Sequence, residues 1–183
     1  MKKICESIPF PRSYWVSPGK LMAGYYPGDR NKEKMKQKLH GLLDCGIRMV
    51  VNLMEPDEID HDGLPFQDYA PVLQNLAVGG HSVECHRMPI CDLNVPSTAF
   101  MIRILDRIDT ALTQESPVYV HCWGGRGRTG TVVGCWLVRR GIAEGKHALE
   151  MIKELRRSDP KAHWPSPEMA SQIAMVLSWE KGE

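Results

Sequence analysis

The chain contains an eleven-residue stretch in which one cysteine and two arginines are interspersed with glycines, His121-Cys122-Trp123-Gly124-Gly125-Arg126-Gly127-Arg128-Thr129-Gly130-Thr131. The residues before it, 118–120, are β-branched or aromatic and follow Pro117, which is typical of a short strand. The residues after it, 132–140, are mostly apolar and end at Gly141, which is typical of a helix. The stretch is therefore predicted to turn from a strand into a helix.

The bulk composition is that of an ordinary globular domain. The 183 residues are 43% hydrophobic and 25% charged, with a formal net charge of +1. A chain of this length fits one domain, so we expect a single domain over residues 1–183. No stretch approaches the roughly 18 apolar residues of a membrane span, and no apolar signal segment follows Lys2 and Lys3. We expect a cytoplasmic protein with no nucleic-acid partner and no membrane insertion, and the oligomeric state is left open.

Six cysteines are scattered through the chain without the spacing of a disulfide framework, so we expect free thiols: Cys5, Cys45, Cys85, Cys91, Cys122 and Cys135. One group, His81, Cys85, His86 and Cys91, has the residue types of metal ligands, but its spacing matches no zinc pattern. The sequence therefore predicts neither a metal nor another cofactor.

Strand and helix patterns alternate along the chain. Strands are expected at residues 14–16, 21–24, 47–53, 83–90 and 118–120, the segments 47–53 and 83–90 being read as buried. Helices are expected from Asn31 to 45, over 65–76, after Ser97, and over 129–140, 144–157 and 166–180. This order predicts an α/β fold, with a central, mostly parallel sheet flanked by helices on both faces. Loops after Leu53, Ile90 and Val120 should then share one crevice at the carboxyl ends of the strands.

The glycine-rich stretch has the composition of an anion-binding nest. A helix N-terminus offers free amides and a partial positive charge, and Gly124, Gly125 and Gly127 allow the backbone amides to point inward. Arg128 can then grip two oxygens of a phosphate group. Because Cys122 would lie at the bottom of this nest, the surrounding amides and arginine favour its nucleophilic thiolate form.

Each of these residues could also have a purely structural role. A buried cysteine beside a glycine-rich turn would account for Cys122, but not for the arginine, the glycines and the strand-to-helix junction together. The Thr129 hydroxyl is placed to hydrogen-bond the sulfur, and His121 to orient the loop from behind. Both side chains could instead only satisfy backbone hydrogen bonds.

A phosphorylated cysteine also needs a proton donor for the leaving oxygen and a base for the hydrolytic water, and one carboxyl group can do both in turn. Asp92 is the candidate for this acid and base, since it lies in a loop that follows a strand expected to end at the crevice. A turn-capping role is its alternative. Asp57 and Glu58 are rivals on another crevice loop, although an acidic surface turn accounts for them.

Residues 121–130 match the signature H-C-x-x-G-x-x-R-[ST]-G of the cysteine-dependent protein tyrosine phosphatase superfamily. The chain resembles its compact dual-specificity members, and most of all the cyclin-dependent kinase inhibitor 3 type, in the acid-loop segments 89–92 and 95–96, and in the segments 15–24 and 166–172. The resemblance implies a metal-independent phosphatase with the CX5R phosphate-binding loop of that fold. It implies Cys122 as nucleophile, Arg128 as phosphate clamp, Asp92 as acid and then base, Thr129 as thiolate stabiliser and the amides of Trp123 to Arg128 as oxyanion ligands.

The substrate class is left open between a phosphoprotein and a phosphorylated small molecule. Arg126 replaces an apolar residue that is usual in the protein phosphatases, and so resembles the 3-phosphoinositide phosphatases, where a basic residue meets a second phosphate. A solvated Arg126, or one paired with the acids near Glu55, is the alternative. Gln172 is read as a surface or packing residue that could also help to place a water. A phosphate-binding module without turnover and a rhodanese-like sulfurtransferase are the remaining hypotheses.

Overall fold

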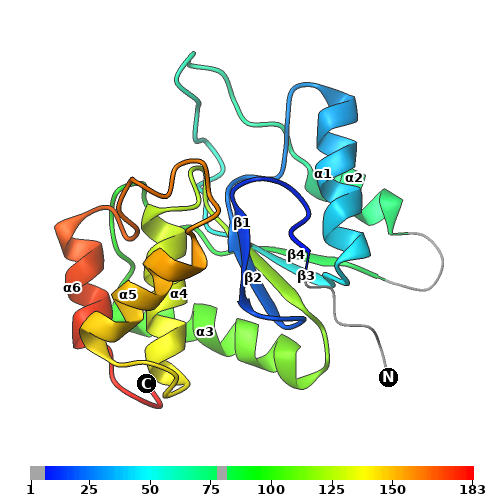
Figure 1. Ribbon diagram of the computed structural model, residues 1–183. Helices are drawn as coiled ribbons and strands as arrows, with labels where there is room; N and C mark the ends of the chain where they lie inside the picture. Colours follow the sequence, from blue (N-terminus) through cyan, green and yellow to red (C-terminus); the bar gives the residue numbers. More distant parts are fainter. Residues whose placement is uncertain (1–6, 78–81) are drawn as a thin grey trace.

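The computed structural model describes residues 7–77 and 82–183, which form a five-stranded sheet between two layers of helices (Figure 1). The strand order is β1-β2-β5-β3-β4. Only the pair β1 and β2 is antiparallel, so the sheet is mostly parallel, as predicted. The strands are β1 (Ser13–Ser17), β2 (Leu21–Gly24), β3 (Met49–Asn52), β4 (Glu84–Arg87) and β5 (Val118–His121).

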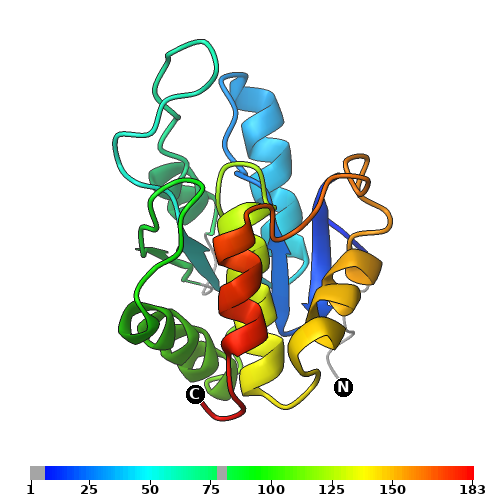
Figure 2. The same cartoon turned by 90° about the vertical axis from the view of Figure 1, so that its left-hand side faces the viewer.

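Helices cover both faces of this sheet. The two on one side are α1 (Lys32–Asp44) and α2 (Ala70–Leu76), and those on the other are α3 (Thr98–Thr113), α4 (Gly127–Arg139), α5 (Gly145–Leu155) and α6 (Ala170–Ser178). In the turned view α6, α4 and α5 stand in front of the sheet and α1 behind it (Figure 2). The prediction of an α/β domain with helices on both faces is confirmed.

Alternate residues of the central strands point into two separate hydrophobic cores. Along β5, Val118 and Val120 pack with α3 to α6, whereas Tyr119 packs with α1 and α2. Along β3, Met49 and Val51 face the first core and Val50 the second. Because successive side chains of a strand point to opposite faces, strands buried on both sides must be apolar throughout. This burial holds β5 rigidly at the centre of the sheet.

Two helix starts follow the sequence prediction. The Asn31 side chain accepts hydrogen bonds from the amides of Glu33 and Lys34 at the start of α1. The Ser97 hydroxyl accepts one from the amide of Phe100 at the start of α3. Each cap satisfies amides that have no partner within the helix.

Several predicted elements are shorter or more exposed than expected. The segment 83–90 is not a buried strand: β4 covers only Glu84–Arg87, lies at the edge of the sheet and is half-exposed, because it has one neighbour and polar side chains. The segment 47–53 is reduced to β3. The helix expected over 65–76 begins only at Ala70, and the helix expected from 166 begins at Ala170, after a proline-containing run that disfavours helix.

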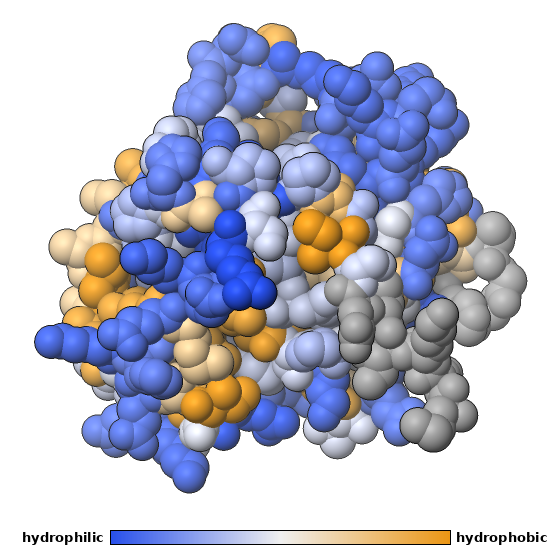
Figure 3. Space-filling model, viewed as in Figure 1, coloured by the Kyte–Doolittle hydropathy of each residue, from blue (hydrophilic) through white to orange (hydrophobic). Residues whose placement is uncertain are grey.

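Among the described residues no helix has the length and apolar character needed to cross a membrane. The side of the molecule drawn in Figure 3 is mostly hydrophilic, with hydrophobic residues scattered between polar ones. Five cysteines are free thiols, and Cys5 lies outside the described residues. Of the four residues with the chemistry of metal ligands, His81 also lies outside them, and the part of the chain that the structure describes contains no group of three or more potential ligands placed to hold a metal ion.

Candidate active site

The glycine-rich stretch forms the turn between β5 and α4. β5 ends at His121 and α4 begins at Gly127, two residues earlier than expected. At Gly125 the backbone has a φ of 69°, and a Cβ atom there would lie 2.6 Å from the carbonyl carbon of Gly24. Only glycine allows both this conformation and this close approach to the end of β2. The loop is therefore fixed by the chain beneath it.

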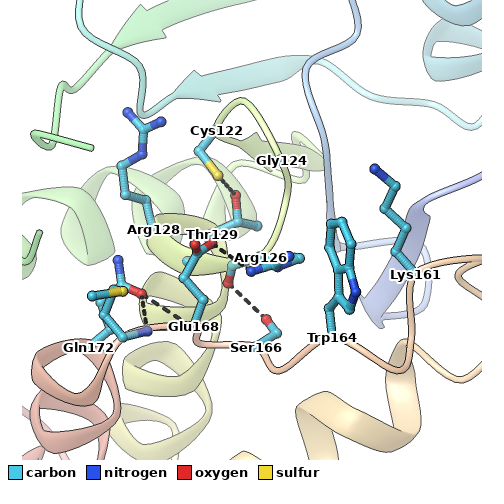
Figure 4. A network of polar contacts seen from close by, with 12 residues as sticks. Cys122, Gly124, Arg126, Arg128, Thr129, Lys161, Trp164, Ser166, Glu168 and Gln172 are labelled. Atoms are coloured by element: carbon cyan, nitrogen blue, oxygen red, sulfur yellow. Dashed lines mark hydrogen bonds and ion pairs between the residues drawn. The ribbon is translucent and has the colours of Figure 1, made fainter. Parts of the chain in front are cut away.

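Cys122 lies at the base of this loop and is almost fully buried. The Thr129 hydroxyl, on the first turn of α4, donates a hydrogen bond to the Cys122 sulfur over 3.1 Å (Figure 4). Thr129 is itself fully buried, so its hydroxyl is held in this direction. The contact expected from the sequence between these two residues is present.

His121 fixes the backbone on the far side of Cys122. Its ring is fully buried, and burial lowers its pKa to about 3, so the imidazole is neutral at physiological pH. Its Nδ1 lies 3.0 Å from the carbonyl oxygen of Cys122, which can only accept, so Nδ1 carries the proton. Nε2 then accepts from the Tyr69 hydroxyl over 2.6 Å. The ring thus orients the loop from behind.

Arg128 is 2% exposed and draws three loops together. Its guanidinium forms two hydrogen bonds with Glu58, and its Nη2 lies 2.8 Å from Asp92. Burial alone would lower its pKa, but the hydrogen bond to Glu58 and the surrounding negative groups raise it above the ordinary value. The loops after β3, β4 and β5 meet at this side chain, which confirms the shared crevice.

The interpretation of Glu58 as part of an acidic surface turn is wrong. Its side chain is only 11% exposed and its carboxylate holds Arg128, whereas Asp57 beside it is exposed. The sequence pattern could not separate these neighbours, because either acid satisfies an exposed turn. The sequence named Glu58 only as a rival to Asp92 for the acid role and did not indicate that it holds Arg128.

Asp92 stands at the mouth of the same site. Its side chain is 48% exposed and is held on one side by Arg128. It lies in the loop between β4 and α3, as the sequence predicted. Its position leaves the carboxylate accessible from the cleft that contains Cys122.

A cleft of about 520 Å³ opens above Cys122, which is within the size range of small-molecule sites. Its aromatic part is formed by Trp123 and His61, whose ring centres lie 4.4 Å apart, and Phe66 packs against Trp123 from outside the cleft lining, with ring centres 5.3 Å apart. Arg126 and three residues of the segment between α5 and α6 also line it: Lys161, Trp164 and Glu168. The remaining lining residues are Arg12, Asp92, Leu93, Gly124, Gly127, Arg128 and Gln172.

Arg126 does not have the partner that one of the sequence alternatives gave it. Its side chain is 17% exposed and pairs with Glu168 over 3.3 Å, not with the acids near Glu55. Its guanidinium also lies 4.7 Å from the centre of the Trp164 ring. Arg126 is therefore a neutralised, packed residue of the cleft wall and not a solvated one.

Of the two structural roles expected for Gln172, packing is the one observed, since its side chain is fully buried and borders the cleft. Its side-chain oxygen accepts from the amides of Glu168 and Met169, and its nitrogen donates to the carbonyl of Asn94 in the loop of Asp92. It therefore connects α6 to the Asp92 loop and is no surface residue.

The cleft wall contains residues that no sequence pattern indicated, chiefly Arg12, Lys161 and Trp164. They lie far from the signature in the sequence and belong to no recognised motif. The similarity noted for residues 166–172 was the one signal that pointed toward this region.

A family model described as polymorphic toxin system, DSP-PTPase phosphatase matches residues 27–142 of this chain. The chain belongs to this phosphatase family. The match includes residues 122–128, the phosphate-binding loop that we call the cradle, together with Asp92 and Glu58. It agrees with the resemblance to compact dual-specificity phosphatases found from the signature.

Two curated proteins illustrate the relationship. Cyclin-dependent kinase inhibitor 3 of Sus scrofa is 25% identical over 138 residues, which are 72% of this chain and 61% of that protein. Phosphatidylinositol 3,4,5-trisphosphate 3-phosphatase ptn1 of Schizosaccharomyces pombe is 41% identical over 68 residues, 36% of this chain and 19% of that protein. The chain thus covers less than two thirds of the length of these curated relatives.

Solved structures share the fold. A crystal structure of Tk-PTP in the active form superimposes with a TM-score of 0.65 at 24% identity, over 91% of this chain and 95% of that one. Kinase associated phosphatase, with its catalytic cysteine replaced by serine, gives a TM-score of 0.68 at 19% identity, over 93% of each chain. The architecture is therefore that of dual-specificity-type phosphatases.

Proposed function

We propose that this protein hydrolyses phosphate monoesters in two steps through a phosphocysteine intermediate on Cys122. The observation that carries the proposal is the convergence, in one cleft, of the buried Cys122 sulfur with the Thr129 hydroxyl, the Arg128 guanidinium and the Asp92 carboxylate. Membership of a phosphatase family supports it.

The cradle binds the scissile phosphate. Backbone amides of Trp123 to Arg128, at the start of α4, donate to its oxygens, and the helix dipole adds positive potential. When the phosphate binds, Arg128 Nη2 leaves Asp92 and donates to a phosphate oxygen instead. The Asp92 carboxyl group is then free to turn toward the leaving oxygen. Glu58 keeps the guanidinium in place during this exchange.

In the first step the Cys122 thiolate attacks phosphorus. A sulfur–phosphorus bond forms, the bond from phosphorus to the leaving oxygen breaks, and Asp92 gives that oxygen its proton. In the second step Asp92 takes a proton from water, whose oxygen attacks phosphorus and displaces the thiolate. The Thr129 hydroxyl stabilises the sulfur as it leaves, and inorganic phosphate is released.

The proposed substrate class is a phosphoprotein, carrying either phosphotyrosine or phosphoserine and phosphothreonine. The accessible Asp92 and the aromatic part of the cleft support it. A phosphoinositide or inositol phosphate is a second candidate. Arg126, which suggested it in the sequence, is paired with Glu168, but the basic residues Arg12 and Lys161 line the cleft that contains Cys122 and support this candidate. The relative from Schizosaccharomyces pombe, which acts on a phosphatidylinositol phosphate by name, supports this second candidate. The cytoplasmic location stays a prediction from the sequence.

The test is a phosphatase assay with an aryl phosphate, phosphopeptides and soluble inositol phosphates, comparing the wild type with Cys122→Ser. We expect the wild type to release phosphate from at least one substrate and the variant from none, while the variant still binds an oxyanion. Retained turnover by the variant contradicts the proposal. Release of thiocyanate from thiosulfate and cyanide, without phosphatase activity, identifies a sulfurtransferase instead.

A further inference from the structure

We propose that Lys161 and Arg12 form a subsite for a second phosphate group carried by a small-molecule substrate. This proposal rests on the proposed function, because the first phosphate must occupy the cradle above Cys122, and it takes up the second of the two candidate substrate classes. It assigns the selectivity to Lys161, in the segment between α5 and α6, and not to Arg126 in the cradle itself.

Lys161 reaches the cleft from outside the phosphatase signature. Figure 4 shows the Trp164 ring between Arg126 and Lys161, with the cradle on the Arg126 side. The Lys161 Nζ lies 4.8 Å from the centre of that ring, and the Arg126 guanidinium carbon lies 4.7 Å from it. Lys161 and Arg12 both line the cavity that contains Cys122. A ligand in the cradle can therefore extend past Trp164 to reach them.

The charged residues on the side of the cleft that carries Arg12, Arg126 and Lys161, which we call the wall, are unevenly paired with carboxylates. Arg126 is paired with Glu168 over 3.3 Å, so it offers little free charge. Asp159 lies 3.1 Å from the buried Arg156 and 3.9 Å from Arg12. Among residues 7–77 and 82–183, no carboxylate lies within ion-pair distance of the Lys161 ammonium. Arg12, Arg156 and Lys161 with Asp159 thus retain a net charge of two positive units beside the cleft.

Arg12 also has hydrogen-bonding capacity to spare. Its Nη2 donates to the carbonyl oxygen of Gly124 over 2.6 Å, which ties it to the cradle. Its Nε is buried and has no hydrogen-bond partner among the described residues. This Nε faces Asp159, whose Oδ1 lies 3.9 Å away, and the partly exposed guanidinium borders the cleft, where its positive charge favours an anionic ligand.

The wall is held in shape by Arg156, which is 2% exposed. Its guanidinium donates to the carbonyl oxygen of Trp164 over 3.1 Å, to that of Lys161 over 3.4 Å and to Asp159 over 3.1 Å. Asp159 in turn accepts from the Lys161 amide over 2.8 Å. These bonds fix the backbone that carries the Lys161 side chain beside the cleft.

The local charge favours a phosphate over a carboxylate as the second group. A phosphomonoester carries about 1.5 to 2 negative charges at neutral pH, which matches two uncompensated positive charges better than a single carboxylate does. Since one cleft of about 520 Å³ contains both Cys122 and Lys161, a compact molecule can reach both. An inositol bisphosphate has this chemistry. A phosphopeptide with an acidic neighbour is the competing ligand.

The experiment compares kcat/KM for three substrates: an aryl phosphate, a soluble inositol bisphosphate and a phosphopeptide with an acidic neighbour. The variants are Lys161→Gln and the charge-preserving Lys161→Arg, with Lys146→Gln as the matched control, since Lys146 is an exposed lysine at the other end of α5. Arg12 is not substituted, because the loss of its hydrogen bond to the carbonyl oxygen of Gly124 would disturb the cradle.

Lys161→Gln should lower kcat/KM for the bisphosphate about tenfold, mainly through KM, while the aryl phosphate changes less than about twofold. Lys161→Arg should keep wild-type selectivity, Lys146→Gln should change nothing, and added salt should shrink the effect. Equal losses on all substrates, no loss on any, or a loss confined to the phosphopeptide overturns the proposal. If the wild type hydrolyses none of the three, the proposed function itself has failed.

Discussion

Both terminal nitrogens of Arg128 are hydrogen-bonded to the two carboxylate oxygens of Glu58, with Nη2 and Oε2 3.1 Å apart. The two residues come from segments 70 positions apart, and both side chains are nearly buried. A buried guanidinium needs an anionic partner, because an uncompensated buried charge is costly. The pair therefore fixes the phosphate clamp before any substrate arrives.

Replacing Glu58 by Gln tests this positioning role. The change keeps the shape but removes the charge, so Arg128 should be held less firmly, and kcat/KM for an aryl phosphate should fall about tenfold. Competitive inhibition by inorganic phosphate should weaken by a similar factor. Asp57→Asn, on the exposed neighbour, is the control and should behave as wild type. A lower melting temperature with unchanged phosphate inhibition would reduce Glu58 to a structural residue.

Asp92 should be needed most where the leaving group is poor. Asp92→Ala removes the proposed acid, so hydrolysis of an alkyl phosphate or phosphoserine should slow by about 10² or more, and that of an activated nitrophenyl phosphate much less. The measurement is the dependence of the first-step rate on the acidity of the leaving alcohol. Equal slowing across the series would assign the proton transfer to another group.

Gly125 and Gly124 provide a matched pair in the cradle. In Gly125→Ala the alanine must adopt a φ of 69°, and its Cβ atom would lie 2.6 Å from the backbone of Gly24. The variant should therefore lose more than about 2 kcal/mol of the free energy of unfolding. Gly124→Ala meets no atom within 4 Å and should cost less than about 1 kcal/mol. Urea unfolding of both variants measures the two losses of unfolding free energy. Similar losses would show that the loop is not held against β2 as described.

The neutral, buried His121 predicts a loss of stability in acid. Its pKa is lowered to about 3 in the folded protein from 6.5, so between these values the unfolded chain binds the extra proton. Stability should therefore fall as pH drops below about 6.5, and this residue alone should account for about 2 kcal/mol at pH 5. Urea unfolding of the wild type and His121→Gln at pH 7 and pH 5 measures it. The difference between the two proteins should shrink in acid; a constant difference would mean that His121 does not titrate in this way.

The sequence predicts the cradle well because its geometry is local. A strand of alternating β-branched and aromatic residues, a glycine-rich turn and an apolar helix each leave a pattern within a few residues. Thr129 directly follows Arg128 in the sequence, so both belong to the same local turn. The position of Asp92 was also predicted, since its loop follows a strand whose carboxyl end was expected at the crevice. These predictions needed no knowledge of long-range packing.

The pairing of charged side chains needed that knowledge. Glu58 and Asp57 are adjacent acids, and only the folded chain shows that one of them meets Arg128. One alternative paired Arg126 with the acids near Glu55, but it pairs with Glu168, because the segment after α5 returns to the cradle. Lys161 and Trp164 join the cleft through the same return, which no spacing in the sequence indicates.

The most direct test of the account is to trap the intermediate on Cys122. The Asp92→Ala variant should be mixed with a radiolabelled, activated aryl phosphate and quenched in acid within the first turnovers, and the labelled peptide identified after digestion. The account predicts a phosphate bound to the sulfur of Cys122, and no label when Cys122→Ser is combined with Asp92→Ala. Phosphate release by the enzyme with no label on Cys122, or label on another residue, would contradict it.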